Sequence, residues 1–245
     1  MWTKRGTLYV RGTFLRNGLP YAASWLDRAK ILWGAVKWPL PVDCVVKSPV
    51  GVFHLTDMGR LNFLRPGWEA GVRSIISSLR CSLFVDVGAN IGLYSVIAGR
   101  NGNDVISFEP EPRTYSFLKE NLSKNDVATS EAYNCAAWDS EGFVDLKKGW
   151  TTAWTQTVEG SQIRATTVDS VLRGRVPGLV KIDVEGSELK VLQGMRETLE
   201  MANRPKIIFE ARTGTKLHES TDFLQRYGYR ITTLDKTDFL AEVTA

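Results

Sequence analysis

The sequence predicts an α/β fold built on a mostly parallel sheet that ends in an antiparallel strand. From residue 83 onward, short apolar runs alternate with helical patterns, which is typical of βαβ units whose sheet is covered on both faces. A glycine-rich turn at 88–92 follows the first of these runs directly. The last two apolar segments, 229–234 and 239–243, lie too close together for a parallel crossover, so we expect them to pair antiparallel.

The elements of this sheet can be placed in order along the chain. We expect strands at 83–87, 105–109, 132–136, 179–184, 207–210, 229–234 and 239–243. Between them we expect helices at 93–99, from Pro112 onward, from a cap at Asp169 to Leu172, from a cap at Ser187 to Leu199, and at 221–227. Every long connection between successive strands therefore carries a helix, although one of them also holds a segment that departs from this alternation.

This segment is residues 142–168, which we interpret as a β-hairpin insertion. Its two strands are expected at 143–146 and 163–167, separated by a loop rich in Trp and Thr. Trp138, Trp150 and Trp154 could offer flat apolar faces to a bound ligand, or they could pack the hairpin onto the sheet. The sequence leaves both interpretations open.

Composition describes a globular chain with an unusual beginning. The 245 residues are 43% hydrophobic and 24% charged, which excludes a disordered or collagen-like chain. The net charge is +4, yet residues 1–40 alone carry +6, so the remainder sums to −2 and does not resemble a nucleic-acid-binding body. We therefore divide the chain into a basic, Trp-rich extension at 1–60 and an α/β domain at 61–245.

Within the extension, an amphipathic helix is expected at about 21–38. Trp25, Leu32 and Trp33 share its apolar stripe, while Arg28 and Lys37 lie off it. Such a helix could pack on the α/β domain, cover a ligand site of that domain as a lid, or lie on an anionic membrane surface. The three scattered cysteines form no metal or disulfide pattern, and no apolar run is long enough to span a bilayer, so we expect a cytoplasmic protein that is at most peripheral to the membrane.

The turn at 88–92 and the acid at the end of the next strand point to a bound adenosine. Ligands of open parallel sheets bind beyond the carboxyl ends of the strands, where Gly88 and Asn90 leave room for them and Asp86 can accept hydrogen bonds. Glu109 is placed to bind the two ribose hydroxyls. The turn lacks GxGxxG, which favours a ligand without phosphates over a nicotinamide dinucleotide. A tight turn that needs glycine for its own sake, and a helix-capping acid, are the structural alternatives.

A second group of charged residues follows the strand at 179–184. Lys181, Asp183 and Glu185 begin on one face of a strand that should be buried, where charges have little structural use. They could bind an acceptor hydroxyl, remove its proton or hold a divalent cation through oxygen atoms. Alternatively, Lys181 and Asp183 only neutralise each other. We assign no residue to a metal, and a metal requirement stays open.

Over residues 80–212 the motifs occur in a set order, and together they resemble one family. They are Asp-Val-Gly-Ala-Asn-Ile-Gly at 86–92, Phe-Glu-Pro at 108–110 with Asn121 and Asn125, Thr-Val-Asp-Ser-Val-Leu at 167–172, Lys-Ile-Asp-Val-Glu-Gly at 181–186, and Phe-Glu at 209–210. This pattern resembles the FkbM-type family of class I S-adenosylmethionine-dependent methyltransferases. The resemblance implies a Rossmann-like, seven-stranded sheet with an antiparallel C-terminal strand, and S-adenosylmethionine as the cofactor.

The resemblance also implies roles for individual residues. Asp86, Gly88, Asn90, Gly92 and Glu109 would form the cofactor site, and Asn134 to Ala136 would border the adenine. Asp183 would face the methyl group as the base or the acceptor-positioning group, with Glu185 and Glu210 near it. Family members act mainly on hydroxyls of sugars, polyketides and other small molecules.

The reaction expected from these residues is methyl transfer to a hydroxyl. The chain has Asp183-Val184-Glu185-Gly186 where amino-methylating relatives of this fold carry an Asn/Asp-Pro-Pro-aromatic turn, so oxygen is the expected acceptor atom. We expect a small-molecule or glycan acceptor; the alternatives are a ribose 2′-hydroxyl of RNA, a nicotinamide-dependent oxidoreductase, and a non-catalytic binding module. His218, in a loop, could also reach an acceptor. The acceptor's identity and the oligomeric state do not follow from the sequence.

Overall fold

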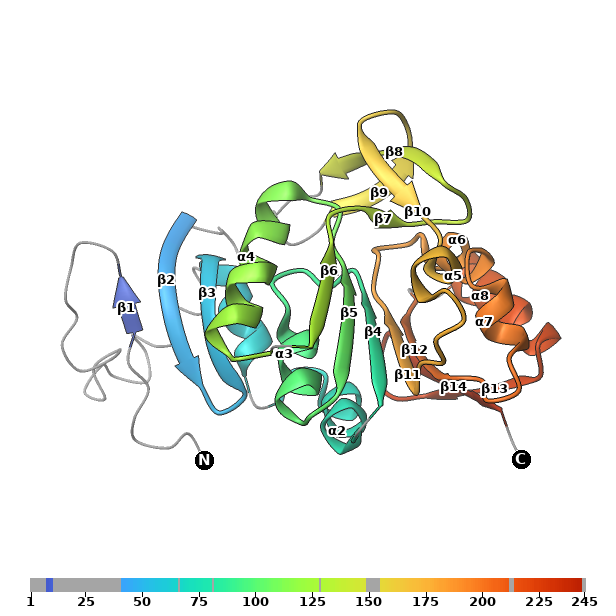
Figure 1. The fold of residues 1–245 in the computed structure, drawn as a ribbon, viewed down its shortest axis with the longest axis horizontal. Coiled ribbons are helices and arrows are strands. Elements are labelled where there is room, and N and C mark those ends of the chain that lie inside the picture. Colours follow the sequence, from blue (N-terminus) through green and yellow to red (C-terminus); the bar gives the residue numbers. More distant parts are fainter. Residues whose placement is uncertain are drawn as a thin grey trace.

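The computed structural model describes residues 8–10, 41–65, 67–80, 82–127, 129–148, 155–211 and 214–243. Its centre is a seven-stranded sheet (Figure 1). In spatial order, the strands are β13 (Tyr229–Thr233), β14 (Asp238–Val243), β12 (Lys206–Glu210), β11 (Leu179–Ile182), β4 (Leu83–Val87), β5 (Asp104–Phe108) and β6 (Ser130–Tyr133). The predicted α/β class is confirmed.

Strand directions match the prediction at the C-terminus. The pairs from β12 to β6 are parallel, whereas β14 runs antiparallel to both β12 and β13. The chain passes from β4 outward to β5 and β6, then returns to β11 on the other side of β4. The order of the strands therefore reverses between β4 and β11, which is the position where open α/β sheets form a ligand crevice.

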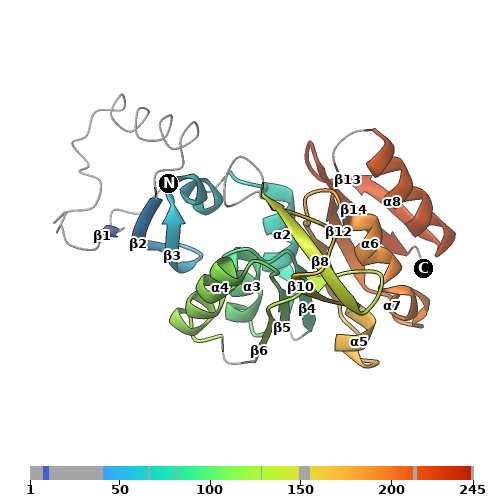
Figure 2. The same cartoon turned by 90° about the horizontal axis from the view of Figure 1, so that it is seen from above.

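Helices cover both faces of this sheet, as Figure 2 shows. On one face lie α2 (Ala70–Ser78), α3 (Leu93–Arg100) and α4 (Pro112–Lys124); on the other lie α5 (Val168–Leu172), α6 (Glu188–Gln193), α7 (Arg196–Glu200) and α8 (Thr215–Arg226). Each face has its own hydrophobic cluster. Alternation along β4 supplies both, because Phe84 belongs to one cluster and Val85 and Val87 belong to the other.

The helix predicted from Ser187 to Leu199 is divided into α6 and α7. Leu192, Met195 and Leu199 are all buried, so the predicted apolar stripe continues across the break. The Asp169 carboxylate accepts hydrogen bonds from the backbone N–H groups of Glu197 and Thr198, at 2.9 and 3.0 Å, and so stabilises a new helix start there.

Two predicted caps were therefore wrong. Asp169 holds the start of α7 instead of α5, whose cap is Thr167, the acceptor of a 3.0 Å bond from the Ser170 N–H. Ser187 stands at the N-cap of α6 without a capping hydrogen bond, since its hydroxyl donates to the Thr157 carbonyl at 2.9 Å. In both cases a contact distant in the sequence replaced the local one.

The insertion is a four-stranded sheet, not a simple hairpin. Its strands are β7 (Ala136–Ala137), β8 (Gly142–Lys148), β9 (Thr155–Glu159) and β10 (Ile163–Thr166), in the order β7-β10-β8-β9. The prediction of a loop across β9 was wrong: this β-branched segment pairs antiparallel with the other side of β8. Trp138 is buried in a small cluster beside this sheet, whereas Trp150 and Trp154 lie outside the described residues.

At the N-terminal end, β1 (Leu8–Val10), β2 (Pro41–Ser48) and β3 (Gly51–Asp57) form an antiparallel sheet, followed by the 3₁₀ helix η1 (Met58–Leu64). Val46, Phe53 and Leu55 share the hydrophobic cluster of α3 and α4. The predicted amphipathic helix at 21–38 lies outside the described residues. No helix in the described part of the chain is both long and apolar enough to cross a membrane.

Candidate active site

A cavity of about 690 Å³ opens where the strand order reverses. The turns that follow β4, β5 and β11 and the last residue of β12 line it, together with Phe63 and residues 67–69 and 235–238. Six of the ten predicted site residues line it: Gly88, Asn90, Glu109, Asp183, Glu185 and Glu210. The cavity thus brings together residues of both predicted groups at the carboxyl ends of the parallel strands.

The turn after β4 packs against the turn after β11 so closely that no side-chain atom fits between the two backbones. Gly88 has φ +80°, and a Cβ atom on it would lie 1.9 Å from the Asp183 carbonyl oxygen. The N–H groups of Gly88 and Ala89 both donate to the Phe108 carbonyl, at 3.0 and 2.9 Å. Only glycine satisfies both the left-handed conformation and the close approach.

Glu109 is the centre of the hydrogen bonds at the end of the cavity that the turns after β4 and β5 form. The residue is 7% exposed, and its carboxylate accepts from the backbone N–H groups of Asn90 and Glu111, each at 2.9 Å. Asn134 donates to the Glu109 carbonyl at 2.9 Å. Burial raises the pKa of Glu109 to about 7, although the two amide donors oppose that shift. Each carboxylate oxygen keeps a lone pair for a further donor such as a hydroxyl.

Four predicted cofactor residues stand behind this surface or beside it. Asp86 is 1% exposed; its Oδ2 accepts from the Ser95 hydroxyl at 2.6 Å, and its Oδ1 has no hydrogen-bond partner among the described residues. Gly92 caps α3, where a Cβ would meet the Leu118 side chain at 2.7 Å. Ala136 is buried in β7, and exposed Asn134 lines a separate hollow of about 400 Å³.

At the other end of the cavity, three acids converge. One carboxylate oxygen from each of Asp183, Glu185 and Glu210 lies within 4.8 Å of the other two. Glu185 adopts φ +55°, a conformation that is rare for a side chain other than Gly, Asn or Asp and that is typical of constrained sites. Lys181, 3% exposed, donates to Asp183 Oδ2 at 2.9 Å. The arrangement concentrates negative charge beside a single buried cation.

Burial and mutual repulsion keep protons on some of these acids. Burial, together with the charge and hydrogen bond of Asp183, raises the pKa of Glu210 to about 9. The pKa of Asp238 is raised to about 7, by burial and by the charge of Glu69. Burial opposes a charge on Lys181, but the neighbouring carboxylates raise its pKa above the ordinary value. Near neutral pH, Lys181 is therefore cationic, and Glu210 keeps a proton next to Asp183.

A family model described as the methyltransferase FkbM domain matches residues 86–231, more than half of the chain. This chain belongs to the FkbM methyltransferase family. All ten predicted site residues lie within the matched range, together with β5, β6, β11 and β12 of the central sheet and parts of β4 and β13.

Curated relatives support this membership. The chain is 34% identical over 146 residues to the hexuronic acid methyltransferase AglP of Haloferax volcanii, covering 57% of this chain and 59% of that protein. It is 30% identical over 156 residues to methyltransferase sdnD of Sordaria araneosa, covering 46% of this chain and 60% of that protein. The matches thus span about three fifths of each relative's length.

A solved structure, a precorrin-6y C5,15-methyltransferase from Geobacter metallireducens, superposes with a TM-score of 0.48 at 14% identity, covering 71% of this chain and 88% of that one. The fold of this FkbM family member follows from its strand order and its family match.

Part of the cavity wall lies outside the FkbM match and was missed by the sequence analysis. Phe63, Trp68 and Glu69 enter from the segment before β4, and residues 235–238 enter from the turn between β13 and β14. The rings of Phe63 and Trp68 pack at 5.4 Å between centroids. The position of the turn after β13 could have been predicted. Because β14 pairs antiparallel with β12, the start of β14 lies beside the end of β12, where Glu210 is.

The histidine considered in the sequence analysis is remote from this chemistry. His218 lies on α8 with its side chain 78% exposed, and its Nε2 is 3.3 Å from the Asp222 carboxylate one turn later. It does not line the cavity of the FkbM domain. Its imidazole is therefore not among the titratable groups that line the cavity.

Proposed function

We propose that this chain is an S-adenosylmethionine-dependent O-methyltransferase whose acceptor is a hydroxyl of a glycan or another small molecule. One observation carries the proposal: a single cavity joins Gly88, Asn90 and Glu109 at one end to the acid cluster around Asp183 at the other. Family membership supports methyl transfer, and the two ends of the cavity have the chemistry for a nucleoside and for a proton acceptor.

The residues at the first end fit an adenosine. The Glu109 carboxylate is fixed by two backbone donors and has lone pairs left for the two ribose hydroxyls. Gly88 and Asn90 keep the turn free of bulk beside it. Asp86, with one oxygen that has no partner among the described residues, lies beneath the turn and can orient a cationic group through water. When bound, S-adenosylmethionine supplies an electrophilic methyl group.

The residues at the second end fit the removal of a hydroxyl proton. Methyl transfer would replace the hydrogen of the acceptor hydroxyl by a methyl group, and neither product keeps the released proton. A carboxylate must therefore accept that proton as the new O–C bond forms. Asp183 is oriented by Lys181, and Glu210 beside it already holds a proton at neutral pH. We therefore assign the base to Asp183, with Glu210 as a hydrogen-bond donor that positions it and Glu185 as a contact for the acceptor.

The aromatic wall and the family relatives support a ring-shaped acceptor. Phe63 and Trp68 offer apolar faces, and the carboxylates that line the same cavity can accept hydrogen bonds from several hydroxyls. AglP is named a hexuronic acid methyltransferase, so sugars are the first acceptors to test. The oxygen atoms of Asp183, Glu185 and Glu210 would also suit Mg²⁺ or Ca²⁺, and the assay should include both ions and a chelator.

The test has two steps. Calorimetry should detect binding of S-adenosylhomocysteine and none of NAD; binding of NAD alone would overturn the proposal. Next, release of S-adenosylhomocysteine is followed with a panel of aryl hexosides, aryl hexuronides and a short RNA. Product formation with a sugar, located by mass spectrometry on an oxygen atom, is the expected result, whereas turnover only with RNA would replace the acceptor class.

A further inference from the structure

Arg60 is a buried cation that lies outside the family match and outside the cavity lining. It belongs to η1 and is 1% exposed. Its Nε donates to Asn90 Oδ1 at 3.2 Å, and its Nη2 donates to the Thr114 hydroxyl at 3.3 Å. Asn90 in turn donates its N–H to Glu109. The guanidinium is therefore one residue removed from the carboxylate that we assign to the ribose.

A ladder of side-chain amides holds the strand before Arg60 in place. Asn121 and Asn125, one turn apart on α4, face Val52 and His54, two residues apart on β3. Asn125 accepts from the Val52 N–H at 2.8 Å and donates to its carbonyl at 2.7 Å, and Asn121 makes the same pair with His54 at 2.6 and 3.3 Å. The two amides reproduce the hydrogen bonds of a neighbouring strand, because one helical turn and two strand residues span nearly the same length.

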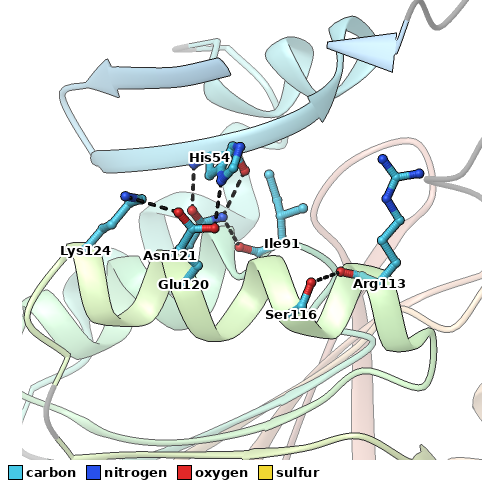
Figure 3. Close-up of polar contacts among 7 residues, drawn as sticks. All are labelled: His54, Ile91, Arg113, Ser116, Glu120, Asn121 and Lys124. Atoms are coloured by element: carbon cyan, nitrogen blue, oxygen red, sulfur yellow. Dashed lines mark hydrogen bonds and ion pairs between the residues drawn. The ribbon is translucent and has the colours of Figure 1, made fainter. Parts of the chain in front are cut away.

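Further contacts strengthen this docking, as Figure 3 shows. Asn121 also donates to the Ile91 carbonyl at 2.8 Å, which connects β3 to the turn after β4. His54 Nδ1 lies 2.7 Å from the Glu120 carboxylate, and Lys124 contacts the same carboxylate at 3.2 Å. The hairpin β2–β3 is thus tied to α4 along the length of β3, and η1 begins from a defined position.

The charge of Arg60 acts on the acids of the cofactor end. It lowers the pKa of both Glu109 and Glu111, against the burial that raises the pKa of Glu109 to about 7. The groups that face the Glu109 carboxylate are Arg60, the Glu111 carboxylate and the N–H groups of Asn90 and Glu111. Arg60 is the cation in that set, and its charge favours the ionised form of Glu109, although less than the two N–H donors do.

We propose that Arg60 is a positioning residue for the cofactor: its hydrogen bond to Asn90 fixes the turn that holds Glu109, which makes the hairpin β2–β3 a working part of the cofactor site. This inference rests on the proposed function. Two effects follow. Loss of the guanidinium lets the Asn90 side chain move, and it lets Glu109 take up a proton that occupies a lone pair needed by the ribose.

The test measures S-adenosylhomocysteine binding by calorimetry at pH 6, 7, 8 and 9. The variants are Arg60→Met, Arg60→Lys and the matched control Arg65→Met, an exposed arginine of the same segment. At pH 7 we expect Arg60→Met to weaken binding by roughly tenfold to a hundredfold, as for loss of a charged hydrogen-bonding partner. The loss should shrink toward pH 9, where Glu109 ionises without help, while Arg65→Met should follow the wild type.

Arg60→Lys separates the two effects and covers the case in which Arg60→Met does not fold. It keeps the charge, so its pH profile should match the wild type, but it loses the forked geometry, so its affinity should be lower at every pH. Wild-type affinity and pH dependence in both folded Arg60 variants would overturn the inference and leave the proposed function intact. A loss in Arg60→Met that is constant from pH 6 to 9 would overturn the role of the charge. Absence of binding to the wild-type chain would instead overturn the proposed function.

Discussion

The two ends of the cavity differ in how their acids are satisfied. At the cofactor end, Glu109 is fixed by two backbone N–H groups and supported by Arg60 through Asn90. At the acceptor end, Asp183 and Glu210 face each other and share the charge of a single buried lysine. The first arrangement is already complete without a ligand, whereas the second holds an excess of negative charge that a ligand hydroxyl or a proton can relieve.

This difference suggests a division of labour within one site. Backbone donors do not titrate, so they hold the Glu109 carboxyl group in place over a wide pH range, even though that group gains a proton near pH 7. Like charges in a half-buried cluster cannot all ionise, so the acceptor end stores a proton and can exchange it. Binding is therefore expected to depend on the first end and proton transfer on the second, and substitutions should separate the two properties.

The largest expected effect is that of Asp183→Asn at the acceptor end. With the acceptor identified by the panel, turnover should fall by roughly 10²- to 10⁴-fold, because the proton loses its acceptor. Affinity for S-adenosylhomocysteine should change by no more than about threefold, since the cofactor end is untouched. A thermal melt of the same sample checks that Lys181, left without its 2.9 Å partner, has not unfolded the domain.

The matched control is Glu210→Gln. Glutamine resembles the protonated acid that Glu210 is at neutral pH, so turnover should fall by less than about tenfold. A loss equal to that of Asp183→Asn would mean that Asp183 is not the ionised member of the pair. Undiminished turnover in Asp183→Asn would remove it from the reaction.

The next effect concerns the backbone contact that joins the two ends. Gly88→Ala must place a methyl group 1.9 Å from the Asp183 carbonyl, in addition to adopting φ +80°. Gly102→Ala imposes the same φ of +80° where no atom lies within 4 Å. We expect Gly102→Ala to cost about 1–2 kcal/mol in the free energy of unfolding, and Gly88→Ala roughly 3–5 kcal/mol, with at least tenfold weaker S-adenosylhomocysteine binding.

Urea denaturation and calorimetry on the two alanine variants make this comparison directly. The difference between them isolates the close approach of the two turns, because the backbone strain is common to both. Equal losses in stability would show that the β4 and β11 turns move apart freely. In that case, the close contact between the two turns would make no contribution to the free energy of unfolding.

The sequence predicted the elements that repeat a local pattern and missed those that depend on distant contacts. The strands at 83–87 and 229–234 were found because their apolar runs end at turn residues. The start of α7 was missed because its cap, Asp169, lies 28 residues away from Glu197. Strand β9 was missed because its polar residues show an edge-strand pattern only once β8 is beside them.

The same distinction applies to the candidate site. The residues at strand ends, such as Gly88, Glu109 and Asp183, could be placed from the sequence because parallel strands bring their carboxyl ends together. Phe63 and Arg60 could not, since they reach the site through the docking of β3 on α4 by Asn121 and Asn125. Those two asparagines stood out as motif residues, but only the structure shows that they bind a strand.

The smallest expected effect is a difference in how the two ends alter stability with pH. Folding raises the pKa of Glu109 from 4.5 to about 7 and that of Glu210 from 4.5 to about 9. In each window the folded protein binds more protons than the unfolded chain, so stability is lost as the pH rises. The loss from Glu109 ends near pH 7, whereas the loss from Glu210 continues to about pH 9. Thermal midpoints between pH 5 and 9 should fall by a few degrees in the wild type. Glu109→Gln should flatten that curve only below about pH 7, whereas Glu210→Gln should also flatten it between about pH 7 and 9. If Glu109→Gln flattened the curve above pH 7, or Glu210→Gln left it unchanged there, the two ends would not titrate separately, and the proposed division between a fixed end and a proton-exchanging end would be wrong.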